Sequence, residues 1–160
     1  MRITEIDGSV TNEQAQSLAE VFISAFDHPP SADFKERLNE KLKLSVLTAQ
    51  SDKVEGFKIG YERYRGVYFS WLGGVLQESR RKGIARSLLR RQHDICLERG
   101  YSEIQTETFG DGKAMLLLNI QEGFEIYGTY IGTDGRLRVQ LRKMLPLQSE
   151  KTNGRLSDRP

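Results

Sequence analysis

A strand followed by a basic, glycine-containing turn and a helix is the feature that most constrains this fold. An apolar run from Trp71 ends in Gly73–Val75, and the segment Arg80–Ala85 then opens an amphipathic helix. The free N–H groups of such a turn, with the positive end of the helix dipole, converge on a small anion. Glycine and alanine let a ligand approach the backbone, whereas bulky side chains block it. The segment therefore predicts a diphosphate-binding turn.

Two familiar phosphate-binding loops do not fit this turn. No Gly-Lys-Ser/Thr closes it, and no G-x-G-x-x-G follows a first strand with an acidic ribose-binding residue downstream. A nucleoside triphosphate is therefore not the expected ligand. The same residues also suit a solvated basic turn on an ordinary protein surface, and the rest of the chain has to decide between the two.

Length and charge limit the class of protein. A chain of 160 residues predicts one ordinary domain with a core that needs no disulfide or metal. The 24 Lys plus Arg and 22 Asp plus Glu residues leave a formal charge of +2, which gives no sign of bulk nucleic-acid or anionic-membrane binding. The opening residues lack a signal-peptide core, and no run reaches the ~20 apolar residues that span a bilayer. We expect a cytoplasmic protein with no nucleic-acid or membrane partner.

The single cysteine, Cys96, excludes an internal disulfide and any thiolate metal cluster, and we expect no metal site. It lies in an apolar helical stripe with Ile84, Leu88, Gln92 and Ile95. This placement favours a buried small hydrophobe over a nucleophile.

The first part of the chain predicts a strand, two helices and two more strands. Thr11 and Gln14 form a capping box for the first helix, Pro29 and Pro30 end it, and Ser31 caps the second. The expected elements are a strand at 2–6, helices at 11–26 and 31–42, and strands at 44–49 and 56–64, the last with Phe57, Ile59 and Tyr61 on one face and Lys58, Gly60 and Glu62 on the other.

The second part predicts a strand at 67–75, the basic turn, a helix that Gly100 ends, and a strand at 102–108. A helix connects these two strands, so they must be parallel. A helix at 111–121 and a hairpin, 124–131 with 136–145 around Thr133-Asp134-Gly135, follow. The predicted fold is α+β with a mixed sheet, a domain at 1–147 and a polar C-terminal tail at 148–160.

In these features the chain resembles the GNAT superfamily of acyl-CoA-dependent N-acetyltransferases. The family signature is Arg or Gln, two residues, Gly, one residue, then Gly or Ala, and here it is Arg80-x-x-Gly83-x-Ala85. Gly123-Phe124 also matches the pair that ends the family's fourth helix, and the likeness covers about residues 2–145. It implies a single GNAT-like domain with a mixed, mostly antiparallel sheet of six to seven strands, about four helices, and central strands that splay apart.

The resemblance implies that acetyl-CoA, as cosubstrate, binds at the basic turn. In the family a bulge ends the fourth strand and leaves its backbone free to pair with the pantetheine arm, while amides of the turn hold the pyrophosphate. Paired glycines late in a strand suit such a bulge, and they also suit a simple strand-ending turn. Many relatives carry an asparagine that binds the pantetheine arm where this chain has Gly112. The expected cofactor-binding residues are Gly73, Gly74, Val75, Arg80, Arg81, Lys82, Gly83, Ile84, Ala85, Arg86 and Gly112.

The reaction implied is transfer of an acetyl group to a primary amine by direct attack in a ternary complex. An ammonium has no lone pair, so a base must remove its proton. Glu107 matches the glutamate proposed as base in some relatives, and Glu62 and the Asp27-His28 pair are the alternatives.

Asn119 stands where many relatives carry a tyrosine thought to protonate the departing thiolate. An amide can donate a hydrogen bond to the sulfur or the thioester oxygen but has no acidic proton. Tyr127 and Tyr130 are possible substitutes, although aromatic residues there also suit strand packing, and a thiolate of pKa ~8.5 can leave unaided.

The expected acceptor is a small-molecule amine or a peptide N-terminus, and the expected state a monomer or homodimer. Because Gly112 and Asn119 depart from the family, a non-catalytic acyl-CoA-binding sensor or regulatory module is the alternative function. A nucleic-acid contact at the basic turn is a third interpretation. The near-neutral charge and the absence of interleaved aromatics disfavour it.

Overall fold

A seven-stranded mixed sheet with the order β1-β2-β3-β4-β5-β7-β6 is the framework of the computed structural model, which describes residues 1–146. Only the β4–β5 pair is parallel among the described strands. The predicted α+β fold is confirmed. The elements are β1 (Arg2–Asp7), α1 (Asn12–Phe26), α2 (Phe34–Asn39), β2 (Ser45–Gln50), β3 (Val54–Tyr64), β4 (Val67–Val75), the 3-10 turn η1 (Gln77–Ser79), α3 (Ile84–Glu98), β5 (Glu103–Phe109), α4 (Lys113–Gln121), β6 (Glu125–Ile131) and β7 (Leu137–Met144).

The helices cover the two faces of this sheet. α1 and α2 pack on one face, in a core that includes Phe57 of β3. α3 packs on the opposite face, where its first turns meet Leu47 of β2. α4 lies on the same face as α3, because its Leu118 packs against the cluster that contains Leu89 of α3. The sheet therefore has an α1/α2 face and an α3/α4 face.

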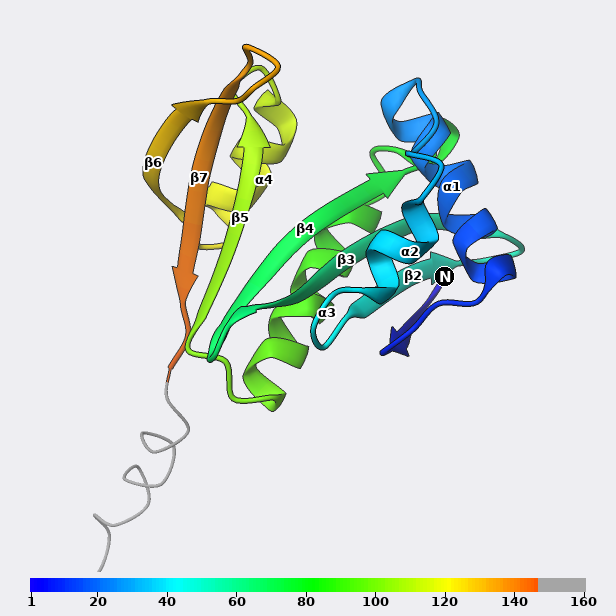
Figure 1. The fold of residues 1–160 in the computed structure, drawn as a ribbon, viewed down its shortest axis with the longest axis horizontal. Coiled ribbons are helices and arrows are strands. Elements are labelled where there is room, and N and C mark those ends of the chain that lie inside the picture. The colour runs from blue at the N-terminus through cyan, green and yellow to red at the C-terminus, as the bar shows by residue number, and fades with distance from the viewer. Residues whose placement is uncertain (147–160) are drawn as a thin grey trace, which may run out of the picture.

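The two central strands separate part-way along their length. β4 pairs with β5 only from Val67–Ser70, opposite residues 103–106. Beyond Ser70 and Thr106 the two strands diverge, and Figure 1 shows them as the arms of a V. β4 stays paired with β3 up to Val75, and β5 stays paired with β7 over its whole length. This confirms the predicted splay of the central strands.

A β-bulge lies just where the separation begins. Ile59 pairs with Leu72 and Gly60 pairs with Ser70, so Trp71 is an extra residue in β4. Side chains alternate between the faces of a strand, and an extra residue inverts that alternation. Ser70 is therefore followed on the α3/α4 face by Gly73 rather than by Leu72, which packs in the α1/α2 core.

Most local signals act as predicted, but α2 is shorter than expected. The capping box of α1 is present, with the amide of Gln14 donating to Thr11 Oγ1 at 3.2 Å. The prediction that Ser31 caps a helix reaching about Leu42 is wrong, since α2 begins after Asp33 and ends at Asn39. Only Phe34 and Leu38 of this segment are buried, which supports less than two turns.

The predicted tail at 148–160 lies outside the described residues. Within residues 1–146 no helix has the length and the apolar character needed to cross a membrane. That part of the chain also brings together no group of three His, Cys, Asp or Glu side chains able to hold a metal ion. Cys96 is buried, and burial raises the pKa of its thiol, as expected for a core residue.

Gly60→Ala is expected to destabilise the fold by about 2 kcal/mol, because a Cβ at this position overlaps the ring of the fully buried Tyr68. Urea denaturation measures the change. Gly128→Ala is the matched control, since its Cβ meets only the end of the Gln140 side chain, which can move. Equal stability of Gly60→Ala and wild type would contradict the packing of β3 against Tyr68.

Candidate functional site

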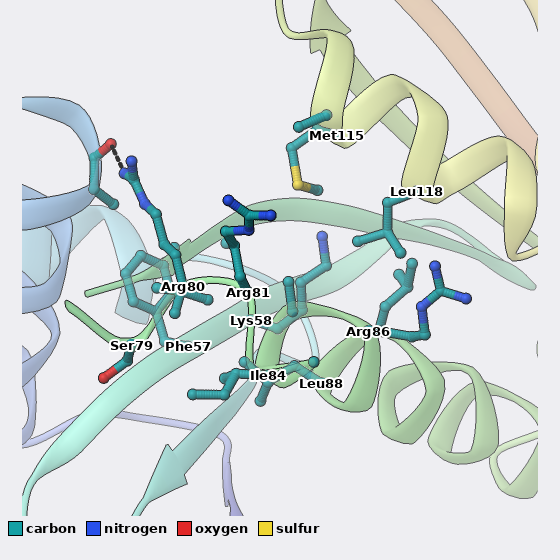
Figure 2. A pocket seen from close by; sticks show the side chains of 18 of the residues that line it. Phe57, Lys58, Ser79, Arg80, Arg81, Ile84, Arg86, Leu88, Met115 and Leu118 are labelled. Atoms are coloured by element: carbon teal, nitrogen blue, oxygen red, sulfur yellow. Dashed lines mark hydrogen bonds between the residues drawn. The ribbon is translucent and has the colours of Figure 1, made fainter. Parts of the chain in front are cut away.

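A cavity of about 540 Å³ opens where β4 leaves β5 (Figure 2). Its walls come from both halves of the strand-turn-helix unit and from the helices on either side. They are formed by Ala25 and Phe26 of α1, Phe57 and Lys58 of β3, Gly73, Gly74 and Val75 of β4, the turn residues Ser79, Arg80, Arg81 and Gly83, Ile84, Ala85, Arg86, Leu88 and Leu89 of α3, and Ala114, Met115 and Leu118 of α4.

The turn before α3 presents unpaired backbone donors to this cavity. Arg81 and Gly83 both have positive φ, 63° and 78°, so the chain turns sharply twice. Gly83 is the N-cap of α3 and provides no side-chain hydrogen bond. The first backbone hydrogen bond of the helix is donated by the Ser87 amide to the Gly83 carbonyl. The three amides before Ser87 therefore have no partner within the helix. A Cβ on Gly83 would meet nothing within 4 Å, so the space in front of the turn is open.

The charged side chains around the turn are mostly cationic. Arg80 donates to the Ala25 carbonyl at 3.1 Å, which ties the turn to the end of α1. Arg81 faces the cavity, and Arg86 lies at its α4 side, 3.1 Å from Glu122. The first turn of α3 contains no acidic residue. Free amides, the helix dipole and these guanidinium groups together favour a multiply charged anion.

Comparisons with known proteins identify the fold. No family model matches the chain, and no curated protein matches its sequence. Among solved structures, the ribosomal-protein-S18-alanine N-acetyltransferase from Escherichia coli superposes with a TM-score of 0.74 at 19% identity, over 90% of this chain and 96% of its own. Ard1 from Thermoplasma volcanium superposes with a TM-score of 0.76 at 16% identity, over 90% of this chain and 98% of its own. An aminoglycoside 6'-N-acetyltransferase complexed with coenzyme A superposes with a TM-score of 0.76 at 13% identity, over 91% of this chain and 98% of its own.

The chain has the GNAT fold. Of the residues that the GNAT resemblance assigns to the cofactor, all except Lys82 and Gly112 line the cavity. Lys82 is exposed and lies outside the lining. Gly112 is the N-cap of α4 and also lies outside it.

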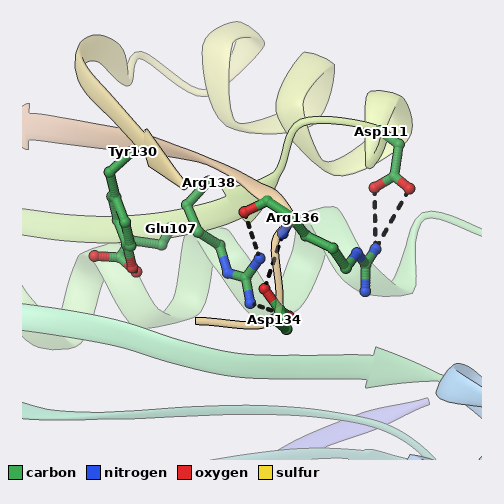
Figure 3. A network of polar contacts seen from close by, with 6 residues as sticks. All are labelled: Glu107, Asp111, Tyr130, Asp134, Arg136 and Arg138. Carbon is green, nitrogen blue, oxygen red and sulfur yellow. Dashed lines mark hydrogen bonds and ion pairs between the residues drawn. The ribbon is translucent and has the colours of Figure 1, made fainter. Parts of the chain in front are cut away.

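Glu107 lies on β5 and is not among the residues that line the cavity. Along β5, Thr106 and Thr108 are buried on the α3/α4 face, so Glu107 between them points to the α1/α2 face. Its carboxylate accepts a 2.7 Å hydrogen bond from the Tyr130 hydroxyl (Figure 3). The guanidinium of Arg63 lies 4.0 Å from the same carboxylate. The hydrogen bond from Tyr130, followed by burial and the carboxylate charge, raises the pKa of Tyr130.

The alternative bases lie elsewhere. Glu62 is paired with Lys43 at 2.7 Å, and this hydrogen bond lowers the pKa of its carboxyl group. Asp27 ends α1 in the left-handed conformation and accepts a hydrogen bond from Gln77. Neither lines the cavity.

None of the expected proton donors lines the cavity. Asn119 of α4 is 1% exposed, and neither atom of its amide has a hydrogen-bond partner. It follows Leu118, which does line the cavity. The Tyr130 hydroxyl donates a hydrogen bond to Glu107. The Arg142 guanidinium lies over the Tyr127 ring, 5.6 Å from the ring centre.

Lys58 lines the cavity, and sequence reasoning missed it. The alternation of β3 placed it on the expected polar face, but α3 covers that face and leaves Lys58 7% exposed. No hydrogen bond or ion pair of Lys58 occurs within residues 1–146. Burial lowers the pKa of its amine to about 8. The small residues Gly56 and Gly60 on the same face were a signal that another element packs closely there.

Lys58→Met is expected to raise the free energy of unfolding by about 2–3 kcal/mol at pH 7, because the buried ammonium disfavours the folded wild type. The folded-state pKa lies below the unfolded one, so wild-type stability rises with pH between about 8 and 10.5 and the gain disappears over that interval. Urea denaturation at pH 7 and near pH 10 measures the free energy of unfolding of the variant and of wild type. The control Lys53→Met changes an exposed lysine just before β3. A gain independent of pH would attribute the effect to packing instead.

Proposed function

We propose that this protein binds acetyl-CoA in the cavity and transfers the acetyl group to a primary amine. The observation that carries the proposal is the turn before α3, where unpaired amides, two positive-φ residues and cationic side chains face a cavity lined by the unpaired end of β4. The space in front of Gly83 is open, as a ligand that approaches the backbone requires. Several structural neighbours of the chain are acetyltransferases, which supports the proposal.

The rest of the coenzyme follows the edge of β4. Beyond Ser70 this edge is not paired with β5, so its N–H and C=O groups are free to bond an extended ligand as an added strand would. Gly73–Val75 line the cavity along that edge. The pantetheine arm has amide groups of the matching kind, and its thioester end then lies in the gap between the strands.

The acceptor amine is proposed to arrive from the α1/α2 face, where Glu107 serves as the base. Aromatic side chains of this face already attract cations, with the Lys41 amine 4.9 Å from the Trp71 ring and 5.0 Å from the Tyr61 ring. Such a surface, with a carboxylate nearby, suits a protonated amine that must lose a proton before attack. Structural neighbours are named for an alanine of a ribosomal protein and for aminoglycosides, so both a peptide N-terminus and a small-molecule amine are candidate acceptors.

Asn119 favours a second candidate function, a non-catalytic acyl-CoA-binding module. Its buried amide offers no acidic proton at a position where the family resemblance leads us to expect a tyrosine. Thiol release from acetyl-CoA with a panel of peptides, polyamines, aminoglycosides and amino acids separates the two functions. Acceptor-dependent thiol release excludes the module, whereas binding without any transfer supports it.

Gly83→Val is expected to weaken coenzyme A binding about tenfold or more, equivalent to one charge-assisted hydrogen bond, because the branched side chain enters the space in front of the turn. Isothermal titration calorimetry measures the affinity. Gly135→Val is the matched control: Gly135 also has positive φ and open space, but lies in the β6–β7 turn. Both variants introduce the same kind of backbone strain. Equal coenzyme A affinities of the two variants would argue against a diphosphate bound in front of Gly83.

Glu107→Gln is expected to leave coenzyme A affinity nearly unchanged and to lower acetyl transfer about 100-fold at neutral pH. Activity recovers in part at higher pH, where the acceptor amine loses its proton unaided. The measurement is the pH profile of thiol release with an active acceptor. Glu103→Gln, four residues earlier on the same face of β5, is the control. A parallel loss at all pH values would assign Glu107 a structural role.

A further inference from the structure

Lys58 extends into the cavity across β4 at Gly73. A Cβ built on Gly73 would lie 3.0 Å from Lys58 Cδ and 3.5 Å from Lys58 Nζ. The missing side chain thus provides the path along which the lysine extends. Figure 2 shows the Lys58 amine pointing into the cavity, with Arg81 on one side and Leu118 on the other in this view.

The surroundings of this amine provide no negative charge. The cavity wall near it is apolar, with Leu88 and Leu89 from α3 and Met115 and Leu118 from α4. The charged residues that line the cavity are Arg80, Arg81 and Arg86, all cations, and no described carboxylate lines it. A buried ammonium without a partner is unfavourable, so the site is suited to a ligand that brings negative charge.

The titratable groups packed around the amine do not supply that charge at neutral pH. His93 of α3 is held neutral, since burial and the charges of Lys143 and Lys58 lower its pKa to about 4. Burial raises the pKa of the Tyr68 phenol on β4, so it is also neutral. The neighbouring β2 residue, Leu47, pairs with Lys58 and is apolar. Lys58 is therefore the group whose protonation changes near neutral pH in this part of the cavity.

A thioester ligand develops negative charge at two places. Its diphosphate is charged throughout and fits the turn at 81–86, where Arg81 and Arg86 neutralise it. Its sulfur becomes negative only when the carbon–sulfur bond breaks. An arm that runs along Gly73–Val75 from the turn brings the sulfur toward the gap, and the Lys58 amine lies at that end.

We propose that Lys58 is a further catalytic residue, whose ammonium group contacts the sulfur of the bound coenzyme and gives it a proton as the thiolate leaves. This inference rests on the proposed function. The acceptor nitrogen bonds to the thioester carbon, the carbon–sulfur electron pair stays on sulfur, and a proton moves from Lys58 Nζ to it. Glu107 removes one proton from the acceptor ammonium before attack and passes it to solvent, and then takes the second proton that the nitrogen loses after attack. Lys58 is reprotonated from solvent.

The proton affinities of the two groups match. Burial brings the pKa of Lys58 to about 8, close to the ~8.5 of a free thiol. Proton transfer between groups of similar pKa is nearly balanced in free energy, which is the condition for efficient general acid catalysis near that pH. This role is the one that the amide of Asn119 does not fill.

The test uses the ultraviolet absorbance of the coenzyme A thiolate in its complex with the protein, titrated from about pH 6 to 9.5, below the ionisation of free tyrosine. It needs no acceptor. The protein's single cysteine, Cys96, is buried with a raised pKa and does not contribute. Wild type, Lys58→Met and the exposed-lysine control Lys53→Met are compared, with binding measured for each by calorimetry. Because Lys58→Met removes a buried charge, it is expected to fold at least as well as wild type.

In wild type and Lys53→Met the bound thiol should ionise about one pH unit or more below the free thiol, because an ammonium faces it. In Lys58→Met it should ionise at or above the free value. The same midpoint in all three complexes would overturn the assignment, and so would loss of coenzyme A binding in Lys58→Met alone, which would place the ammonium against another part of the ligand. Failure of wild type to bind coenzyme A refutes the proposed function itself. A bound thiol that ionises at the same pH as the free thiol, in a tight complex, refutes only the role of Lys58.

Discussion

The site depends on a hydrogen-bonded ladder that stops early. β4 and β5 pair over four positions, Val67–Ser70, and then separate. Beyond Ser70, β4 stays paired with β3 alone and β5 with β7 alone. Each inner edge beyond Ser70 is left with backbone groups that need partners. The cavity, the access from both faces of the sheet and the proposed ligand path all follow from this one interruption.

Unsatisfied polar groups gather around the same interruption. Ser70 Oγ, Thr108 Oγ1 and both atoms of the Asn119 amide are buried without partners in β4, β5 and α4, as are Gln92 Oε1 and His93 Nε2 in α3. The Lys58 amine, which faces the cavity, has no hydrogen-bond partner among the described residues either. Buried polar groups of a folded protein normally find partners. A concentration of them at one place is destabilising for the free protein and is what a site built for a polar ligand shows.

Sequence reasoning predicted the elements and the splay better than it predicted the directions of side chains. The capping box at Thr11, the parallel pair and the hairpin follow from local patterns and a chirality rule, and they are confirmed. The burial of Lys58 was missed because alternation separates the faces of a strand without saying what covers each face. The exposed position of Lys82 depends on the positive φ values of its neighbours, which composition does not reveal. The early end of α2 reflects the lack of apolar positions after Leu38.

The extra residue at Trp71 is a position at which β4 can change length without redirecting the side chains that follow it. Upstream of it Tyr68 and Ser70 share the α3/α4 face, and downstream the odd-numbered Gly73 takes over that face. Excising Trp71 would remove the bulge and restore regular alternation, with Leu72 still in the α1/α2 core and Gly73 still beside Lys58. A β4 shorter by this residue is therefore compatible with the same cavity wall.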